Sequence, residues 1–309
     1  MPTSKERIAG ALYGLLIGDA LGVPYEFRPP EAIPPKEQIE FMPPRRYDRA
    51  HAGVPPGTWS DDGAQALVLL ASLLDCGRFD AEDFGQGLVA WYDEGYMAVD
   101  GKVFDVGIQT SSSIRALRRG TSALEAGGTD EYSNGNGSLM RVMPLALWHC
   151  GTDAQLVADA HAQSRVTHGH PRSQMCCALY CLWARRIFQE HPQPWGDALT
   201  TLQSLYGDDS VYRKELDYHI RPFNESEVTG SGYVIDCLRS ALWASNQGGF
   251  EDALKAAIAL GRDTDTTGCV TGGIVGLREG VDAIPSRWRT GLLGKDLFKD
   301  RLGQLLLRF

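Results

Sequence analysis

The stretch I-A-G-A-L-Y-G-L-L-I-G-D-A-L-G, residues 8–22, places a glycine at every fourth position, at 10, 14, 18 and 22. A four-residue repeat keeps these glycines on one face of a helix. Because glycine has no side chain, another backbone or a ligand can approach that face closely. The stretch resembles the apolar part of a signal peptide, but Asp19 interrupts it, no convincing cleavage site follows, and it is too short to span a bilayer. We therefore expect a buried helix here.

Further stretches of helical length and composition follow, separated by Gly, Pro and Asn clusters. Ser60-Asp61-Asp62 forms a candidate N-terminus for the apolar run 64–74. The other predicted helices cover residues 81–94, 108–119, 153–164, 173–188, 233–245, 250–260 and 268–277. Residues 29–56 are rich in proline and are expected to form a long, functional loop. Alternating β-branched runs are nearly absent, so the pattern predicts an all-α fold.

Length and composition restrict the class of protein. The 309 residues, 43% hydrophobic and 22% charged, exclude disorder and collagen-like repeats and can bury a large core. No linker or repeat divides the chain, so a single domain over residues 1–309 is expected, as a compact multi-helix orthogonal bundle. The net charge of −9 disfavours binding to nucleic acid or to an anionic membrane. Seven cysteines without a C-x-x-C pair argue against disulfides and zinc, and predict a reducing, cytoplasmic location.

Two acidic corners, G-T-W-S-D-D-G at 57–63 and G-R-D-T-D-T-T-G at 261–268, each place two carboxylates and a hydroxyl before an apolar helix. One interpretation is an ordinary acidic helix start, favoured by the helix dipole. If the corners converge, however, four carboxylates need neutralisation, which two divalent cations would supply. Oxygen-only ligands favour Mg²⁺, Mn²⁺ or Ca²⁺. An EF-hand is excluded because Ile274 stands where a bidentate Glu is needed.

Three further features carry candidate chemistry. The segment S-N-G-N-G-S-L-M-R, 133–141, has two Asn-Gly steps that permit positive φ and a phosphate cradle of N–H groups, although a plain tight turn is equally compatible. His168 and His170 end a predicted helix and are more typical of caps or supporting groups than of ligands. Glu26, between two aromatic residues, is either a general acid or base of raised pKa or a half-exposed surface acid.

Five motifs in chain order resemble the ADP-ribosylglycohydrolase family, over about Ile8 to Leu277. The motifs are G-A-L-Y-G-L-L-I-G-D-A-L-G-V-P-Y-E-F, G-T-W-S-D-D, S-N-G-N-G-S-L-M-R, T-H-G-H-P and G-R-D-T-D-T. The resemblance implies an all-α fold with a binuclear Mg²⁺ or Mn²⁺ site at its centre. The sequence departs from the family's pattern at two places. Ser60 stands where many relatives have Thr, and Thr267-Gly268-Cys269 replaces a commoner Asn-Ala-Ala continuation.

The resemblance also implies roles for individual residues. The implied metal ligands are Ser60, Asp61, Asp62, Asp263, Asp265 and Thr266. The implied catalytic residues are Glu26, Asp62 and Asp105. The implied substrate-binding residues, around the diphosphate and ribose, are Ser133, Asn134, Gly135, Asn136, Gly137 and His168. The charge argument had already selected the same four aspartates of the two corners.

The implied reaction is hydrolysis of the bond between the ribose C1 of ADP-ribose and an acceptor on a modified protein. The cations would hold the ribose hydroxyls, stabilise an oxocarbenium-like transition state and activate water, with Glu26 relaying the proton. Release from arginine needs a carboxylate for the guanidinium. Of Asp100 and Asp105, the second is expected because F-D-V-G resembles a segment in arginine-specific relatives; alternatively, Asp105 is only an N-cap for the next helix.

Other readings of the resemblance stay open. The chain could act on O-linked ADP-ribose, on serine or as O-acetyl-ADP-ribose, or it could be a non-catalytic relative that binds ADP-ribose. Tyr206, Tyr212 and Tyr233 are candidates for stacking on the adenine. The expected partners are an ADP-ribosylated protein and ADP-ribose, with no nucleic acid and no membrane, and a monomer is slightly favoured over an oligomer.

Overall fold

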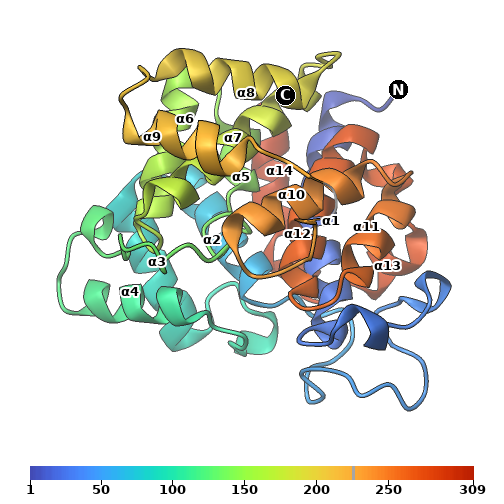
Figure 1. Ribbon diagram of the computed structural model, residues 1–309. Helices are drawn as coiled ribbons and strands as arrows, with labels where there is room; N and C mark the ends of the chain where they lie inside the picture. The colour runs from blue at the N-terminus through green and yellow to red at the C-terminus, as the bar shows by residue number, and fades with distance from the viewer. Residues whose placement is uncertain (225–226) are drawn as a thin grey trace.

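Two helices from opposite ends of the chain, α1 (Ser4–Gly22) and α12 (Thr264–Glu279), lie antiparallel and in direct contact at the heart of the molecule (Figure 1). The computed structural model describes residues 1–224 and 227–309. The glycines of α1 face those of α12, Gly10 against Gly276 and Gly18 against Gly268. A Cβ added at Gly18 would lie only 2.0 Å from the carbonyl oxygen of Gly268. The repeat therefore serves backbone contact between helices.

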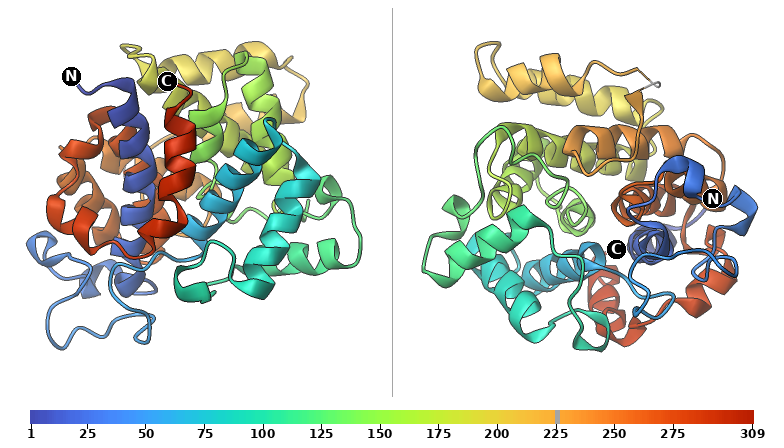
Figure 2. Two further views of the ribbon diagram at one scale, coloured as in Figure 1. Left: turned by 180° about the vertical axis from the view of Figure 1, so that it is seen from behind. Right: turned by 60° about the horizontal axis from the view of Figure 1, so that its bottom comes forward.

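The remaining helices surround this pair (Figures 1 and 2). They are α2 (Asp61–Cys76), α3 (Ala81–Glu94), α4 (Ile108–Arg118), α5 (Met143–Trp148), α6 (Asp153–Arg165), α7 (Pro171–Phe188), α8 (Pro194–Leu205), α9 (Val211–Glu215), α10 (Val234–Ser245), α11 (Phe250–Ala259), α13 (Ser286–Gly291) and α14 (Lys299–Leu306). The described residues contain two isolated bridges and no strand, which confirms the all-α prediction. Helices α5, α8, α9, α13 and α14 were not predicted, because they are short or mark no clear apolar period.

Local sequence explains where the central helices begin and end. Thr3 and Glu6 form a capping box at the start of α1. Ser60 caps α2, accepting a hydrogen bond from the backbone N–H of Asp62, and α2 ends at Gly77, whose φ of 66° is left-handed. Residues 29–56 contain only short 3₁₀ turns, so the prediction of a long loop is confirmed.

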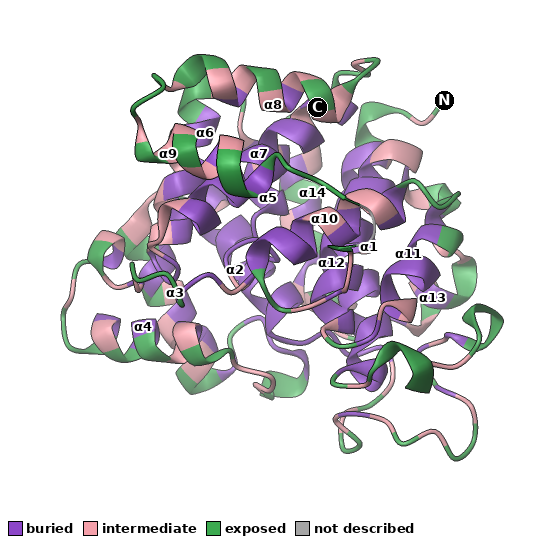
Figure 3. Ribbon diagram, in the orientation of Figure 1, coloured by how far each residue is buried: buried purple, intermediate pink, exposed green. Residues whose placement is uncertain are grey.

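Burial is concentrated in the central helices, and Figure 3 shows them almost wholly buried. The segment Ser4–Tyr25 is long and apolar enough to cross a membrane, so the expectation that it is too short to span a bilayer is wrong, because the helix extends beyond the apolar stretch at both ends. However, 94% of its most apolar window is buried inside the protein, as the prediction of a buried helix requires. Packing against the other helices thus accounts for its apolar character.

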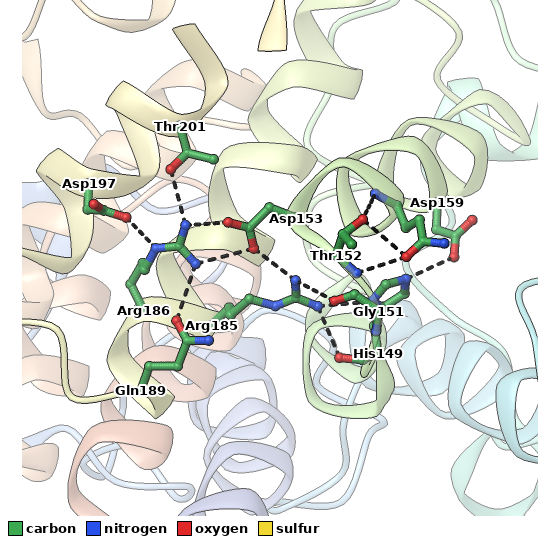
Figure 4. A network of polar contacts seen from close by, with 11 residues as sticks. His149, Gly151, Thr152, Asp153, Asp159, Arg185, Arg186, Gln189, Asp197 and Thr201 are labelled. Carbon is green, nitrogen blue, oxygen red and sulfur yellow. Dashed lines mark hydrogen bonds and ion pairs between the residues drawn. The ribbon is translucent and has the colours of Figure 1, made fainter. Parts of the chain in front are cut away.

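A polar network fastens the outer helices α6, α7 and α8 to one another (Figure 4). Asp153 at the start of α6 forms ion pairs with both Arg185 and Arg186 of α7. Arg186 also pairs with Asp197 of α8, and Arg185 donates to the carbonyl oxygen of His149 at 3.0 Å. Each of these ion pairs is only partly buried and contributes modestly to stability. The network fixes the outer layer without reaching the acidic corners.

Replacing Gly18 with Ala is expected to lower the free energy of unfolding by about 3 kcal/mol, because the added methyl group must separate α1 from α12. Thermal or denaturant unfolding measures the loss. Gly303→Ala in α14 is the matched control, since a Cβ there meets no atom within 4 Å, and it should stabilise by up to about 1 kcal/mol. Equal effects of the two substitutions would contradict the role of close backbone contact.

Candidate active site

A cleft of about 910 Å³ opens where the two acidic corners meet the Asn-Gly segment. Its walls include acidic side chains from separate parts of the chain: Glu26, Asp61, Asp62, Asp105 and Asp263. They also include Gly135, Asn136, Gly137, His168 and Thr266. Among the other residues expected to form the site, Ser60, Asp265, Ser133 and Asn134 are buried beside this cleft rather than lining it. The structure thus gathers residues that are up to 240 positions apart, as 266 − 26 shows.

The first acidic corner is held by a carboxylate of α1. Asp19 is fully buried and accepts hydrogen bonds from the backbone N–H of Ser60 at 2.8 Å and of Gly63 at 2.7 Å. Burial raises the pKa of Asp19 to about 7, while these hydrogen bonds act in the opposite direction. Asp19 therefore serves as a side-chain cap for the start of α2. In the sequence, the only sign of this role is that Asp19 interrupts an apolar stretch.

The second corner is positioned by the contact between α1 and α12. Thr264 donates its hydroxyl to the carbonyl oxygen of Gly22 at 2.8 Å, so the start of α12 is tied to the end of α1. The Thr266 hydroxyl lies 3.4 Å from Asp62 Oδ1 and so links the two corners. Carboxylate oxygens of Glu26, Asp263 and Asp265 lie within 4.8 Å of one another. The predicted convergence of the two corners is present.

The electrostatics of the gathered carboxylates are unfavourable without a counter-charge. Burial raises the pKa of Asp61, Asp62 and Asp265 well above the usual value, and the neighbouring carboxylates raise it further. Burial also raises the pKa of Glu26 to about 11, with smaller contributions from Asp105 and other acids. Such a set of charges needs protonation or bound cations.

The donor set fits hard divalent cations. Asp62 Oδ2 and Asp265 Oδ2 are buried and have no hydrogen-bond partner among the described residues, which is costly for a carboxylate unless a cation binds it. The hydroxyls of Ser60 and Thr266 lie at the starts of the same two helices. All these groups are oxygen ligands, which Mg²⁺ and Mn²⁺ prefer.

Asp61 is oriented by a buried chain of hydrogen bonds. Gln65 Nε2 donates to Asp61 Oδ2 at 2.9 Å, and Arg141 Nη1 donates to Gln65 Oε1 at 2.8 Å. Arg141 is fully buried, and its other nitrogens donate to the side chain and the carbonyl of Gln163. Burial lowers the pKa of Arg141 to about 10, so it carries its positive charge at neutral pH. Arg141 stands in the motif S-N-G-N-G-S-L-M-R, but nothing in that pattern predicts a role for it.

The Asn-Gly segment lines the cleft differently from the expectation. Neither Gly135 nor Gly137 is among the positive-φ glycines, so the expected left-handed steps are wrong. Glycine is required at 137 by space instead, because a Cβ there would lie 2.8 Å from His168 Cε1. The backbone N–H of Asn136 donates to the carbonyl oxygen of Gly232, which leaves fewer N–H groups for a phosphate than a full cradle would offer.

Side chains of this segment have separate tasks. Asn136 Nδ2 donates to Asp263 Oδ2 at 2.8 Å, which joins the segment to the second acidic corner. Ser133 donates to Asp130 Oδ2 at 2.6 Å. Asn134 Nδ2 donates to the carbonyl oxygen of Glu131, and Asn134 Oδ1 accepts from Ser173. Ser133 and Asn134 thus stabilise the loop through hydrogen bonds outside the cleft, whereas Asn136 lines the cleft.

His168 and His170 differ in role. Burial lowers the pKa of His168 to about 3, helped by the charge of Arg141, so the imidazole is neutral. Its Nδ1 lies 2.8 Å from the Thr167 hydroxyl, and its ring faces the cleft beside Gly137. His170 Nδ1 accepts a hydrogen bond from the backbone N–H of Arg172 and caps α7, as the interpretation of a capping histidine predicted.

Glu26 and Asp105 both line the cleft, and the alternative interpretations, a surface acid and a helix N-cap, are wrong. Glu26 is only 4% exposed, so it is no surface acid. Its segment is fastened to the second corner, because the backbone N–H of Phe27 donates to the carbonyl oxygen of Arg262. Asp105 is not the N-cap of α4, which is Gly107. One imidazole that sequence reasoning missed, that of His51, lies 2.7 Å from Glu26 Oε2.

The tyrosines expected to stack on adenine do not line this cleft. Tyr206 and Tyr212 pack on His161 with ring centroids 6.0 and 4.6 Å away. The hydroxyl of Tyr233 accepts from Arg172 at 3.0 Å. The aromatic residues that do line the cleft are Phe27 and Tyr132, which are 66% and 97% exposed. Periodicity could not have revealed them, because both stand in loops.

Comparison with known proteins gives consistent results. The family model for ADP-ribosylglycohydrolase matches residues 1–309. ADP-ribosylarginine hydrolase Tri1 of Serratia proteamaculans is 31% identical over 98% of this chain and 79% of its own length. ADP-ribosyl-[dinitrogen reductase] glycohydrolase of Rhodospirillum rubrum is 29% identical over 94% of this chain and 92% of its own length.

A solved structure described as an ADP-ribosylglycohydrolase-related protein complex superimposes with a TM-score of 0.76 and 31% identity, covering 98% of this chain and 96% of that one. The match extends beyond the five motifs to the complete helical arrangement. The resemblance found in the sequence is confirmed: this chain belongs to the ADP-ribosylglycohydrolase family.

Proposed function

We propose that this protein is a metal-dependent hydrolase that removes ADP-ribose from modified protein side chains, with N-linked ADP-ribosylarginine as its substrate. The observation that carries the proposal is the cleft lined by Glu26, Asp62 and Asp105. Asp62 Oδ2, and Asp265 Oδ2 beside the cleft, are buried without a hydrogen-bond partner among the described residues. The names of the relatives from Serratia proteamaculans and Rhodospirillum rubrum support the linkage to arginine and the action on a protein.

Six residues would hold two divalent cations, Mg²⁺ or Mn²⁺: Ser60, Asp61, Asp62, Asp263, Asp265 and Thr266. When bound, the cations would orient the ribose hydroxyls, polarise the attacking water and offset the charge of the carboxylates. Asp62 would serve both catalysis and cation binding. It is linked to the second corner through Thr266, and its Oδ2 atom has no hydrogen-bond partner among the described residues and is available to a cation. Asp19 and Gln65 keep the first corner in place for this purpose.

The chain supplies the proton transfer. Hydrolysis breaks the bond between ribose C1 and the acceptor nitrogen; the hydroxyl of water joins C1, and the proton of water ends on the nitrogen. Glu26 is buried at the cleft wall and is the carboxylate placed to accept this proton and return it. Neighbouring positive charge would bring its pKa down from the high value that burial imposes.

Asp105 would receive the guanidinium of the departing arginine. Its side chain is 24% exposed, so one face is open to the cleft while the other is supported by the protein. A carboxylate binds a guanidinium with two parallel hydrogen bonds, which also fixes its orientation. Gly135, Asn136, Gly137 and His168 would contact the ribose and diphosphate, and Ser133 and Asn134 would support them.

The setting of this activity is also part of the proposal. We place the protein in the cytoplasm, as a single domain of residues 1–309 that acts on an ADP-ribosylated protein as a monomer. The seven cysteines, all free, support a reducing compartment. The contact between α1 and α12 from the two ends of the chain supports the single domain.

Metal and pH dependence of stability form one prediction. The pKa of Glu26, Asp62 and Asp265 is raised in the folded state. As pH rises above about 4, these carboxyl groups therefore ionise in the unfolded chain before they ionise in the folded one, which lowers the free energy of unfolding. With chelator, the melting temperature is therefore highest in mild acid and falls as pH rises, by about 5 °C or more between pH 5 and pH 8. Mg²⁺ or Mn²⁺ should raise it more at pH 8 than at pH 5, because ligands must be deprotonated. A melting temperature that ignores both pH and metal would contradict the site.

Asp61→Ala and Asp265→Ala are each expected to abolish both tight Mn²⁺ binding, measured by titration calorimetry, and turnover. Each removes a buried carboxylate from one of the two corners. Asp208→Ala is the matched control, because its side chain is 93% exposed and lies on the surface. An Asp265→Ala protein that folds, lacks the metal and still hydrolyses substrate would overturn the metal-dependent mechanism.

Substrate linkage is tested by the release of free ADP-ribose from arginine-modified and serine-modified proteins, with Mg²⁺, Mn²⁺ or chelator. We expect metal-dependent release from arginine alone. Asp105→Ala should lower kcat/KM for the arginine substrate by about 100-fold, because a charged hydrogen-bonded pair contributes up to about 3 kcal/mol. Unchanged cleavage by Asp105→Ala would remove the guanidinium role, and release from serine instead would move the activity to O-linked ADP-ribose.

A further inference from the structure

The loop of residues 29–56 brings one side chain, His51, to the reaction centre. Its Nε2 atom lies 2.7 Å from Glu26 Oε2, at hydrogen-bond distance, and 3.9 Å from Asp105 Oδ1. Among the described residues, no other histidine forms an ion pair with either of these carboxylates. One ring nitrogen thus stands between the group proposed to move the proton and the group proposed to bind the guanidinium.

The ring of His51 is fixed by the neighbours of these same carboxylates. Phe27, which follows Glu26, lies with its ring centroid 5.6 Å from that of His51. Phe104, which precedes Asp105, lies 5.1 Å away on the same criterion. The imidazole therefore contacts a carboxylate and an aromatic ring in each of the segments 26–27 and 104–105. These two segments are far apart in the sequence, and the ring of His51 contacts both of them.

The side from which His51 approaches decides its role. Glu26, Phe27 and Asp105 line the cleft, whereas His51 and Phe104 are not among its lining residues. The imidazole consequently reaches the carboxylates from the protein side and leaves their cleft faces to the substrate. Its side chain is 18% exposed. This placement is that of a supporting residue and not of one that touches the substrate.

The backbone at this point is strained in three places that meet. Phe27, His51 and Asp105 have φ values of 61°, 47° and 55°, a left-handed conformation that is unfavourable for residues other than glycine. Such conformations persist where surrounding contacts over-determine them and are common at functional sites. Here the contacts around these three residues include those of the imidazole with two carboxylates and two aromatic rings.

The loop is docked around His51 by additional hydrogen bonds. The backbone N–H of Ala50 donates to the carbonyl oxygen of Pro24 at 3.0 Å. Arg28 donates to both the carbonyl oxygen and the carboxylate of Asp48, at 2.9 and 2.7 Å. The N–H of Val54 donates to the carbonyl oxygen of His51 at 2.8 Å. The position of the imidazole is therefore built into the fold of the loop.

We propose that His51 is a positioning residue of the arginine reaction, which holds Glu26 and Asp105 at a fixed separation so that one substrate can engage both. The inference rests on the proposed function for its kinetic part and on geometry for the rest. It assigns the long proline-rich loop a task, because the loop places an imidazole against both carboxylates.

The kinetic test compares three substitutions at one position. His51→Phe keeps a ring between Phe27 and Phe104 but removes the nitrogen, and it should lower kcat on the arginine-linked substrate by about 10- to 100-fold while KM changes by less than about threefold. His51→Gln returns a hydrogen-bonding nitrogen and should recover most of kcat. His51→Ala loses both packing and hydrogen bond and should also raise KM. His219→Phe, on an exposed histidine, is the matched control and should leave both constants unchanged.

The outcomes separate this inference from the proposed function. If the unmodified protein releases ADP-ribose from arginine and His51→Phe retains its kcat, the positioning role is wrong and the function stands. If the unmodified protein releases none, the function is wrong and a second measurement decides on His51. The ring-nitrogen NMR signals of His51, assigned by their loss in His51→Phe, should shift in Glu26→Gln and stay in place in Asp208→Ala. Signals that ignore Glu26→Gln would overturn the contact itself.

Discussion

Contact between two glycine-lined backbones, those of α1 and α12, is the constraint on which the rest of the structure depends. Because neither helix has side chains at the crossing, the ends of the two helices lie as close as backbones can. At the last crossing, Gly22 stands against Thr264 and Asp265, where an added Cβ would lie 2.4 Å from the backbone of Asp265. The contact that stabilises the core therefore also fixes one half of the acidic site, and bulk introduced at the crossing would displace both.

The negative charges of a site built in this way repel one another and are unfavourable when buried. Several carboxylates are withdrawn from water with few donors to satisfy them, and burial raises their pKa accordingly. The fold offsets part of this cost locally. Backbone N–H groups of Ser60 and Gly63 stabilise Asp19, and the positive charge of Arg141 reaches Asp61 through Gln65. Within the described part of the chain, Asp62 Oδ2 and Asp265 Oδ2 have no hydrogen-bond partner, and this is the part of the charge that cations are suited to balance.

What the sequence predicted and what it missed follow from the range of the interactions. The glycine repeat and the two acidic corners are local sequence patterns. Their interpretation does not depend on residues far away in the chain, so both could be predicted from the sequence directly. Convergence of the corners was only a condition of the charge argument, and the family resemblance implied it. Asp19, Arg141 and His51 were missed as working parts because their hydrogen bonds span 41, 76 and 25 residues and leave no local pattern. The Asn-Gly steps misled because neither glycine has positive φ, and Gly137 instead answers a need for space that only the position of His168 reveals.

The two halves of the site consequently differ in how firmly they are held. The groups proposed to hold cations stand on helix starts, where capping and helix contact fix them. Glu26 and Asp105, proposed to act on the acceptor, stand in irregular segments whose left-handed backbone is costly by itself. Such conformations persist where surrounding contacts over-determine them, and here these contacts include the hydrogen bond from Phe27 to Arg262 and those of the His51 imidazole with both carboxylates. It follows that cation binding should survive changes in the loop that impair the acceptor side, so the two properties can be separated within one fold.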